Sequence, residues 1–255
     1  MTTKTVRIAF FVLAATCVFA APAWAQPMFP AGCSNATFTG TYGISFNGID
    51  QKSRLRAAVG EIRANGKGEF SGTVTESKNG AIKSGPISGT YAIDGNCTGS
   101  GTTSSNGKVR HYNLVVVSRG SGLELIQTDA GFTEAGFAEA QGKLTCTIAG
   151  VKGTYGFGAR GTILGVGVVA FNGQFVLNGA GKVNGSESGS LNGTIFSNLG
   201  LSGTYNINSN CTGSAAVTPK GLSTFHFNFV VVNGGHGMLA LETDGNTVVS
   251  GSTQK

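Results

Sequence analysis

The feature that most constrains the fold of this chain is an internal repeat. Residues 89–100 read GTYAIDGNCTGS, and residues 203–214 read GTYNINSNCTGS. The correspondence extends over most of the chain, since Cys33 aligns with Cys146 and HYNLVVV (111–117) aligns with HFNFVVV (226–232). The offset between aligned residues changes only by single positions, as is typical of two copies of one unit that differ by short loop insertions. The sequence therefore predicts a tandem duplication.

Each copy has the pattern of an all-β protein. Short runs rich in Thr, Val, Tyr and Phe are separated by turn residues, glycine is abundant and proline is scarce. The run GFTEAGFAEAQ (131–141) is helix-like by itself, but its counterpart NTVVSGSTQK (246–255) is typical of a strand. We predict eight strands per copy, which in the first copy lie near 38–46, 54–64, 68–77, 81–93, 97–103, 108–117, 122–129 and 132–140.

The turns between these runs predict how the strands connect. Asn-Gly pairs at 65–66, 79–80, 178–179 and 192–193 predict type I′ hairpin turns, because both central residues of that turn need a positive φ. Hairpin-linked strands favour two tandem repeats, each an antiparallel up-and-down meander of about eight strands closed as a small β-barrel, since closure removes exposed edges. The interior of such a barrel is just filled by side chains or holds one small ligand.

The N-terminal residues predict export. Lys4 and Arg7 precede an apolar run that ends in the small-residue site Ala23-Trp24-Ala25, the pattern of a secretory signal peptide. We predict a signal peptide over 1–25, a first β-barrel-like repeat over 26–144 and a second over 145–255. No later segment is apolar for long enough to form a transmembrane helix. The mature chain is expected in the periplasm or outside the cell.

The cysteines follow the repeat. Without Cys17, which lies in the predicted signal, the chain has four: Cys33, Cys97, Cys146 and Cys211. An even number in an exported protein indicates two disulfides, for which three pairings exist. Pairing within each copy, Cys33 with Cys97 and Cys146 with Cys211, is the most local arrangement and is the one we favour.

The charge pattern indicates no nucleic-acid partner. The formal charge is +6, and it falls to +4 without the two basic residues of the signal. One basic feature lacks a counterpart in the second copy: Lys52, Arg54 and Arg56 alternate in QKSRLRAAV. Alternation on one strand face predicts a basic stripe for an anionic lipid or an acidic polysaccharide, and a solvated barrel face remains the alternative.

The repeated pattern also carries a resemblance. GTY, then NCTG, an FVVV strand and a Thr-Asp turn resemble a group of exported bacterial proteins of unknown function, over both copies. The barrel expected here is similar to those of the avidin and lipocalin superfamily. No ligand-site motif of that superfamily is present to match, so the resemblance implies a fold and no ligand.

One polar pair recurs in both copies, His111 with Asn113 and His226 with Asn228. Strand alternation puts each pair on one face, and in the second copy Phe225, Phe227 and Phe229 lie on the other. A polar pair inside the barrel would bind a small molecule, whereas a pair outside would be structural. We favour the phenylalanines inside, with the valines of the His/Asn face covered by the other copy.

The sequence gives little support for catalysis. No nucleophile elbow, zinc motif or phosphate-binding loop is present, and no cofactor is indicated. His111 and Asp129 would supply two members of a Ser-His-Asp set, without a distinguishable serine. The acidic residues of the second copy, Glu187, Glu242 and Asp244, are too few to nominate a carboxylate pair. We therefore expect a protein that is not an enzyme.

The leading functional hypothesis is an exported, non-catalytic binding or surface-interaction protein. A structural component of an extracellular matrix or envelope is the alternative, because the second copy is nearly chargeless. A single sixteen-stranded outer-membrane barrel is the third possibility. The sequence identifies neither a ligand nor an oligomeric state.

Overall fold

The structure, a computed structural model, describes residues 32–255. The predicted signal peptide and Cys17 lie outside these residues. Within 32–255 the only helices are 3-10 turns of three residues, η1 (Asn35–Thr37), η2 (Ser118–Gly120), η3 (Ala149–Val151) and η4 (Asn233–Gly235). None of these turns has the length to cross a lipid bilayer.

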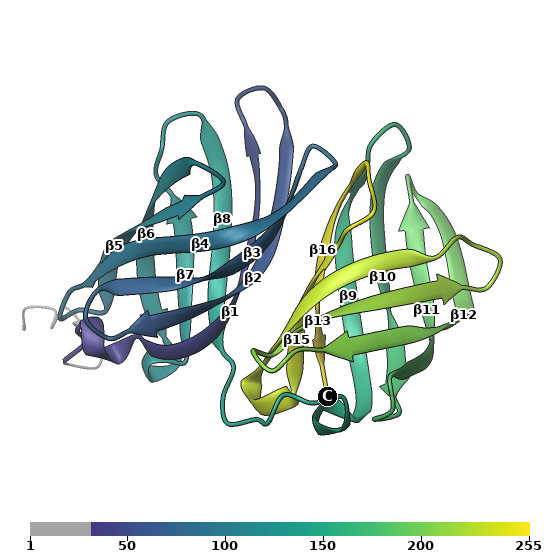
Figure 1. Cartoon of the computed structure of the whole chain (residues 1–255). Coiled ribbons are helices and arrows are strands. Elements are labelled where there is room, and N and C mark those ends of the chain that lie inside the picture. Colours follow the sequence, from purple (N-terminus) through teal and green to yellow (C-terminus); the bar gives the residue numbers. More distant parts are fainter. Residues whose placement is uncertain (1–31) are drawn as a thin grey trace, which may run out of the picture.

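Sixteen antiparallel strands close into two barrels of eight (Figure 1). The first barrel contains β1 (Thr39–Asp50), β2 (Leu55–Asn65), β3 (Glu69–Lys78), β4 (Ala81–Ile93), β5 (Thr98–Ser105), β6 (Lys108–Val117), β7 (Gly122–Gln127) and β8 (Phe132–Ala140). The second contains β9 (Gly153–Ile163), β10 (Gly167–Leu177), β11 (Lys182–Leu191), β12 (Thr194–Ile207), β13 (Thr212–Pro219), β14 (Phe225–Val232), β15 (Gly237–Glu242) and β16 (Thr247–Gln254). The predicted all-β class and the two barrels are confirmed, and a single sixteen-stranded barrel is not formed.

The hairpin turns agree with the sequence at some positions and differ at others. Asn79-Gly80 and Asn192-Gly193 have positive φ at both residues, as a type I′ turn requires. The prediction for Asn65-Gly66 is wrong, as it is for its repeat counterpart 178–179, because only the glycine has a positive φ. The Asn65 side chain instead accepts hydrogen bonds from the backbone N–H groups of Lys67 and Glu69, at 2.7 and 3.1 Å, and stabilises a longer loop.

Each barrel is closed at one end by short segments that the tyrosines of the GTY motifs hold in place. All four tyrosines are buried, and their hydroxyl groups donate to backbone carbonyls of these segments. The bonds run from Tyr42 to Gly120 (2.7 Å), from Tyr91 to Phe38 (2.7 Å), from Tyr155 to Gly235 (2.8 Å) and from Tyr205 to Ile148 (3.1 Å). The repeated tyrosine therefore anchors the closed end of both barrels.

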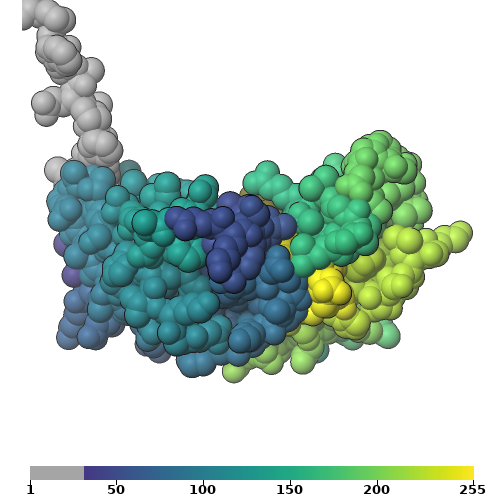
Figure 2. Space-filling view, turned by 90° about the horizontal axis from the view of Figure 1, so that it is seen from above, coloured from purple at the N-terminus to yellow at the C-terminus, as the bar shows by residue number. Residues whose placement is uncertain are grey.

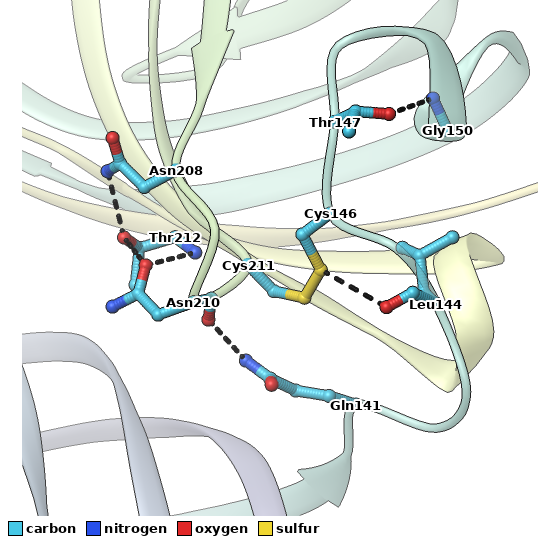
Figure 3. Close-up of a disulfide and its surroundings, with 9 residues drawn as sticks. All are labelled: Gln141, Leu144, Cys146, Thr147, Gly150, Asn208, Asn210, Cys211 and Thr212. Carbon is cyan, nitrogen blue, oxygen red and sulfur yellow. Dashed lines mark hydrogen bonds between the residues drawn. A yellow bond between two sulfur atoms is a disulfide. The ribbon is translucent and has the colours of Figure 1, made fainter.

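Disulfides fasten the same end. Cys33 is bonded to Cys97 and Cys146 to Cys211, the pairing favoured from the sequence. Figure 3 shows the second bridge, where the segment between the barrels runs past the β12–β13 loop and the Gln141 side chain donates to the carbonyl of Asn210 at 3.1 Å. Loops of 64 and 65 residues closed in this way are stabilised by roughly 4 kcal/mol each in the chain-entropy account.

The two barrels point in the same direction. At one end the Asn246 N–H donates to the Gly80 carbonyl at 3.0 Å, and at the other the Gly234 N–H donates to the Gln141 carbonyl at 2.7 Å. We call the end with the 3-10 turns and disulfides the plug end. The opposite end, the tip end, consists of the hairpin turns 51–54, 79–80, 106–107, 128–131, 164–166, 192–193, 220–224 and 243–246.

An apolar interface joins the barrels along their sides. Its buried members come from β2 in the first barrel and from β14, β15 and β16 in the second: Ala57, Val59, Val230, Val232, Leu239, Leu241 and Val248. The Asn228 side chain adds a hydrogen bond to the Thr75 hydroxyl, 3.0 Å across the interface. In the second copy the valines of the His/Asn face, Val230 and Val232, are thus covered by the other copy, as the sequence analysis favoured, whereas Val115 of the first copy is exposed.

The interface depends on a glycine in β1. A Cβ added at Gly43 would lie 2.5 Å from Cγ1 of Val232 and 2.9 Å from Cγ1 of Val230. Valine side chains have little rotamer freedom with which to yield. The repeat counterpart Gly156 has no such constraint, since its added Cβ would meet nothing closer than the Gln254 carbonyl oxygen at 3.9 Å.

We therefore expect Gly43→Ala to lower the free energy of unfolding by about 1–3 kcal/mol through overpacking. Gly156→Ala is the matched control and should leave stability unchanged or slightly higher, because alanine loses less backbone entropy than glycine. Urea unfolding followed by circular dichroism measures both. Equal stability of the two variants would contradict the close packing at Gly43.

Candidate functional site

The second barrel encloses an apolar cavity of about 140 Å³. Strand alternation places the aromatic face of β14 inside, so Phe225, Phe227 and Phe229 line it, as expected from the sequence. Phe157 and Phe175 line the opposite wall, and their rings lie 5.7 Å apart. The cavity is thus bounded mainly by apolar carbon, to which phenylalanine rings contribute from both sides.

The corresponding space in the first barrel is occupied by charged side chains. Arg56 forms ion pairs with Glu134 and, at 3.1 Å, with Glu76. Arg110 lies 3.6 Å from the same Glu76 carboxylate, and the Tyr112 hydroxyl donates to Glu134 at 2.8 Å. Burial opposes the charge on Arg56, but the carboxylates of Glu134 and Glu76 outweigh it and raise the pKa of the guanidinium.

Each member of this network has an uncharged counterpart in the second barrel. Aligned through the repeat, the counterparts of Arg56, Glu76, Arg110, Tyr112 and Glu134 are Val169, Gly189, Phe225, Phe227 and Val249. Another counterpart is smaller, since Leu125 becomes Ala240. The first barrel retains a cavity of only about 40 Å³. The two barrels therefore share one strand arrangement, but side chains fill the interior of the first and leave a cavity in the second.

A single carboxyl group stands out in the hollow barrel. Glu242 lines the cavity, is 3% exposed, and its Oε1 has no hydrogen-bond partner within residues 32–255. Burial raises the pKa of Glu242 to about 7, with a further contribution from the charge of Asp244, although a hydrogen bond from Thr247 acts in the opposite direction. Both protonation states are therefore populated near neutral pH, as general acid or base catalysis requires.

Two more polar groups face the cavity. Glu187, half-buried on β11, also lines it, and burial raises the pKa of its carboxyl. The hydroxyl of Thr253 is buried there without a partner in the described residues. The sequence analysis names both glutamates but finds too few acidic residues for a carboxylate pair, and this is corrected because the fold brings Glu187 and Glu242 to one cavity. Its one sequence signal is that Glu242 stands where the first copy has Gln127.

The structure places both His/Asn pairs on the outside. His111 and His226 are exposed, and their Nδ1 atoms lie 2.6 and 2.8 Å from carboxylate oxygens of Asp129 and Asp244. The same aspartates accept the backbone N–H of each histidine, at 2.9 and 2.7 Å. Both contacts fix the strand to the neighbouring hairpin turn.

The asparagines of these pairs differ between the copies. Asn113 is exposed, whereas Asn228 lies in the barrel interface. The structure does not bring either His/Asn pair to a cavity. Within 32–255 no group of three His, Cys, Asp or Glu side chains is placed to hold a metal ion.

The three basic residues do not form a stripe. Lys52 and Arg54 belong to the β1–β2 turn, where Ser53 has a φ of 57° and interrupts the strand alternation. Arg54 is exposed and pairs with Asp50 at 2.6 Å, while Arg56 points into the first barrel. The predicted common face is therefore wrong, and only Lys52 and Arg54 remain available to an outside partner.

No family model and no curated protein matches the chain. Among solved structures it is similar to kievitone hydratase from Nectria haematococca, with 4% identity over 89% of this chain and 93% of that chain and a TM-score of 0.31. It is also similar to CghA with Sch210972 (9%, 84% and 87%, TM-score 0.26) and to an AttH from Nitrosomonas europaea (8%, 91% and 97%, TM-score 0.30). These values are too low to transfer a substrate, a reaction or a site residue.

The expectation that the chain is not an enzyme is corrected: the matched structures include one of a hydratase, and the expectation itself does not follow from the residues, since the cavity joins two carboxyl groups. That expectation rested on the absence of contiguous catalytic motifs. A barrel interior brings groups from different strands to one cavity without such a motif, as it does for Glu187 and Glu242. Catalysis is therefore no longer excluded.

The buried carboxyl gives the folded protein a specific pH dependence. The pKa of Glu242 is raised from 4.5 to about 7, so between these values the folded chain holds a proton that the unfolded chain releases. Stability should therefore fall as the pH rises through this window, by up to about 3 kcal/mol from this residue. Glu242→Gln, which restores the residue of the first copy, should remove that decrease.

The measurement is urea unfolding of both proteins at about pH 5 and about pH 8. Other titrating groups are common to the two proteins, so the difference between them isolates Glu242. Glu124→Gln, on the exposed face of β7, is the control and should keep the wild-type dependence. An unchanged dependence in Glu242→Gln would show that the carboxyl is not buried in its acid form.

Proposed function

We propose that the second barrel binds a small, largely apolar molecule that presents a hydrogen-bond donor or a cationic group to Glu242. The observation that carries the proposal is the buried Oε1 of Glu242, which has no partner in the described residues and lies in an aromatic cavity. A buried polar atom without a partner costs free energy, about 1–3 kcal/mol. A ligand that supplies the missing hydrogen bond recovers part of that cost.

The size of the cavity limits the ligand. An engineered apolar cavity of about 150 Å³ binds benzene, so about 140 Å³ admits one ring or a short branched chain. Aromatic walls with few polar groups provide affinity through burial and orientation through the polar contact. The second copy is nearly chargeless, which in the sequence analysis favours a matrix or envelope component. Part of its apolar composition forms the cavity wall.

We place this function in an exported protein, in the periplasm or outside the cell. Both disulfides support an oxidising compartment. The resemblance to exported bacterial proteins and the predicted signal peptide agree with this location. Native mass spectrometry of protein purified from its own host would identify a retained molecule.

Binding can be tested with toluene, benzylamine and benzoate, which share a ring and differ in charge. By calorimetry at neutral pH we expect benzylamine to bind more tightly than toluene and benzoate not to bind, because a carboxylate would face Glu242. Glu242→Gln should retain toluene and reduce the preference for benzylamine by about tenfold, or about 1.4 kcal/mol. Tighter binding of benzoate than of benzylamine would contradict the assigned role of Glu242.

A second variant tests the location. Ala240→Leu, which places the side chain of Leu125 at the equivalent position, should fill the cavity and abolish binding of all three probes while the protein remains folded. Ala135→Leu, on the exposed face of β8, is the control and should bind as the wild type does. Undiminished toluene binding by Ala240→Leu would place the site elsewhere.

A further inference from the structure

The tip end of the molecule carries most of its exposed apolar side chains. Residues 32–255 expose ten large apolar side chains, and eight of them lie in a tip-end turn or within two residues of one: Ile49, Val109, Ile126, Phe132, Val166, Val168, Ile195 and Leu222. Only Val176 lies as close to a turn of the plug end. Ile195 is the most exposed of the ten, at 68%. The two ends of the barrels are therefore different surfaces.

Both barrels contribute to this surface. The tips face the same way because the β15–β16 turn contacts the β3–β4 turn through Asn246 and Gly80. Figure 2, which views the molecule from the tip end, shows the barrels side by side in direct contact. In the second barrel the Asn192 side chain binds the backbone of Val166 and Val168, at 2.7 and 3.0 Å, and holds two exposed valines at the rim.

Cations surround the mouth of the first barrel at the same end. Lys52, Arg54, Lys78 and Lys108 lie in the tip-end turns or next to them, and Asp50 pairs with Arg54 (2.6 Å) and with Lys78 (3.7 Å). Burial lowers the pKa of the Lys78 ammonium, and the nearby charges of Lys108 and Arg54 lower it further. Asp50 thus pairs with two of these four cations, and an added anion would relieve the repulsion among Arg54, Lys78 and Lys108.

These two properties together select the partner. An acidic polysaccharide would bind the cations and leave the apolar tips in water. A neutral apolar surface would accept the tips and leave the cations without counter-charges. An anionic lipid surface takes up both, because apolar side chains enter the acyl boundary while Lys and Arg stay at the headgroups.

We propose that the tip end docks on an anionic lipid surface, with the apolar rim of the second barrel inserted and the basic mouth of the first barrel against the headgroups. The proposal does not depend on the cavity ligand. It retains Lys52 and Arg54 from the predicted basic stripe and adds Lys78 and Lys108.

Flotation of the protein with vesicles tests the docking. Wild-type protein should bind phosphatidylcholine vesicles that contain phosphatidylglycerol and should not bind vesicles of phosphatidylcholine alone. Val168→Ser with Ile195→Ser should reduce binding by about tenfold or more, since two apolar side chains lose their transfer into the lipid. Lys78→Ser with Lys108→Ser should reduce binding and weaken its sensitivity to salt, because Lys52 and Arg54 remain.

Matched changes at the plug end serve as controls. Val176→Ser and Lys182→Ser each alter a residue of the same type away from the tips and should bind as the wild type does. Thermal melting of each variant confirms that it is folded. Equal losses at the two ends, or binding to neutral vesicles alone, would overturn the proposal, as would binding to alginate together with failure to bind the anionic vesicles.

Insertion is measured directly by a tryptophan reporter. Trp24 is the only tryptophan of the chain and lies in the predicted signal peptide, so protein that begins at Gln26 allows a single reporter to be placed. Ile195→Trp should show a blue-shifted emission when anionic vesicles are added, and Val176→Trp should not. An unshifted Ile195→Trp spectrum in a protein that floats with the vesicles would show that the rim does not insert.

Discussion

Each barrel depends on the backbone hydrogen bonds that join its first strand to its last. β1 pairs with β8 from Tyr42 to Asp50, and β9 pairs with β16 from Gly156 to Ile163. Closure leaves no free strand edge and forces alternate side chains of every strand into one interior. What each copy does then depends on which side chains that interior receives. The frame itself is held at the plug end by the tyrosines and disulfides, so the interior is free to vary.

The two interiors show contrasting uses of this freedom. In the first, two arginines and two glutamates neutralise one another, and the tyrosine hydroxyl satisfies a remaining oxygen. A buried network of this kind specifies one arrangement, and removal of one member leaves a costly buried charge. In the second, aliphatic and aromatic residues replace the network and leave space. The hydrophobic interior provides room for a ligand that the charged interior does not, which is why the proposed binding lies in the second copy alone.

Much of the fold could be predicted because it depends on local or repeated signals. Turn pairs and alternation place the strands, and the duplication extends each inference from one copy to the other. Cys33 and Cys97 could be paired because each copy supplies two cysteines. The burial of the phenylalanines of β14 followed from comparing the two faces of one strand. The strands, the disulfides and the buried face of β14 can each be inferred from one strand or from a comparison of the two copies.

Other features depend on tertiary structure and could not be read in this way. Alternation predicts one face for Lys52, Arg54 and Arg56 only if the strand includes all three, but Lys52 and Arg54 lie in the turn before β2 and Arg56 lies within β2. Asn65 forms a side-chain bridge where a tighter turn was expected. The cavity carboxyls come from β11 and β15, strands that are not neighbours in the barrel. A search for sequence motifs could not join them, and for the same reason it could not exclude catalysis.

The contrast between Gln127 and Glu242 has a consequence for how the second barrel could arise after the duplication. Replacing the charged network of the first barrel by apolar residues takes several coordinated substitutions, because each charged side chain is neutralised by another. A single replacement is enough to introduce the carboxyl group of Glu242, since glutamine and glutamate codons differ only in their first base. One nucleotide change at this position therefore suffices to exchange a neutral amide for an ionisable group. An acidic group in the cavity wall is therefore readily gained and lost, and sister proteins that share the hollow barrel are expected to differ at this position before they differ in the apolar residues of the wall.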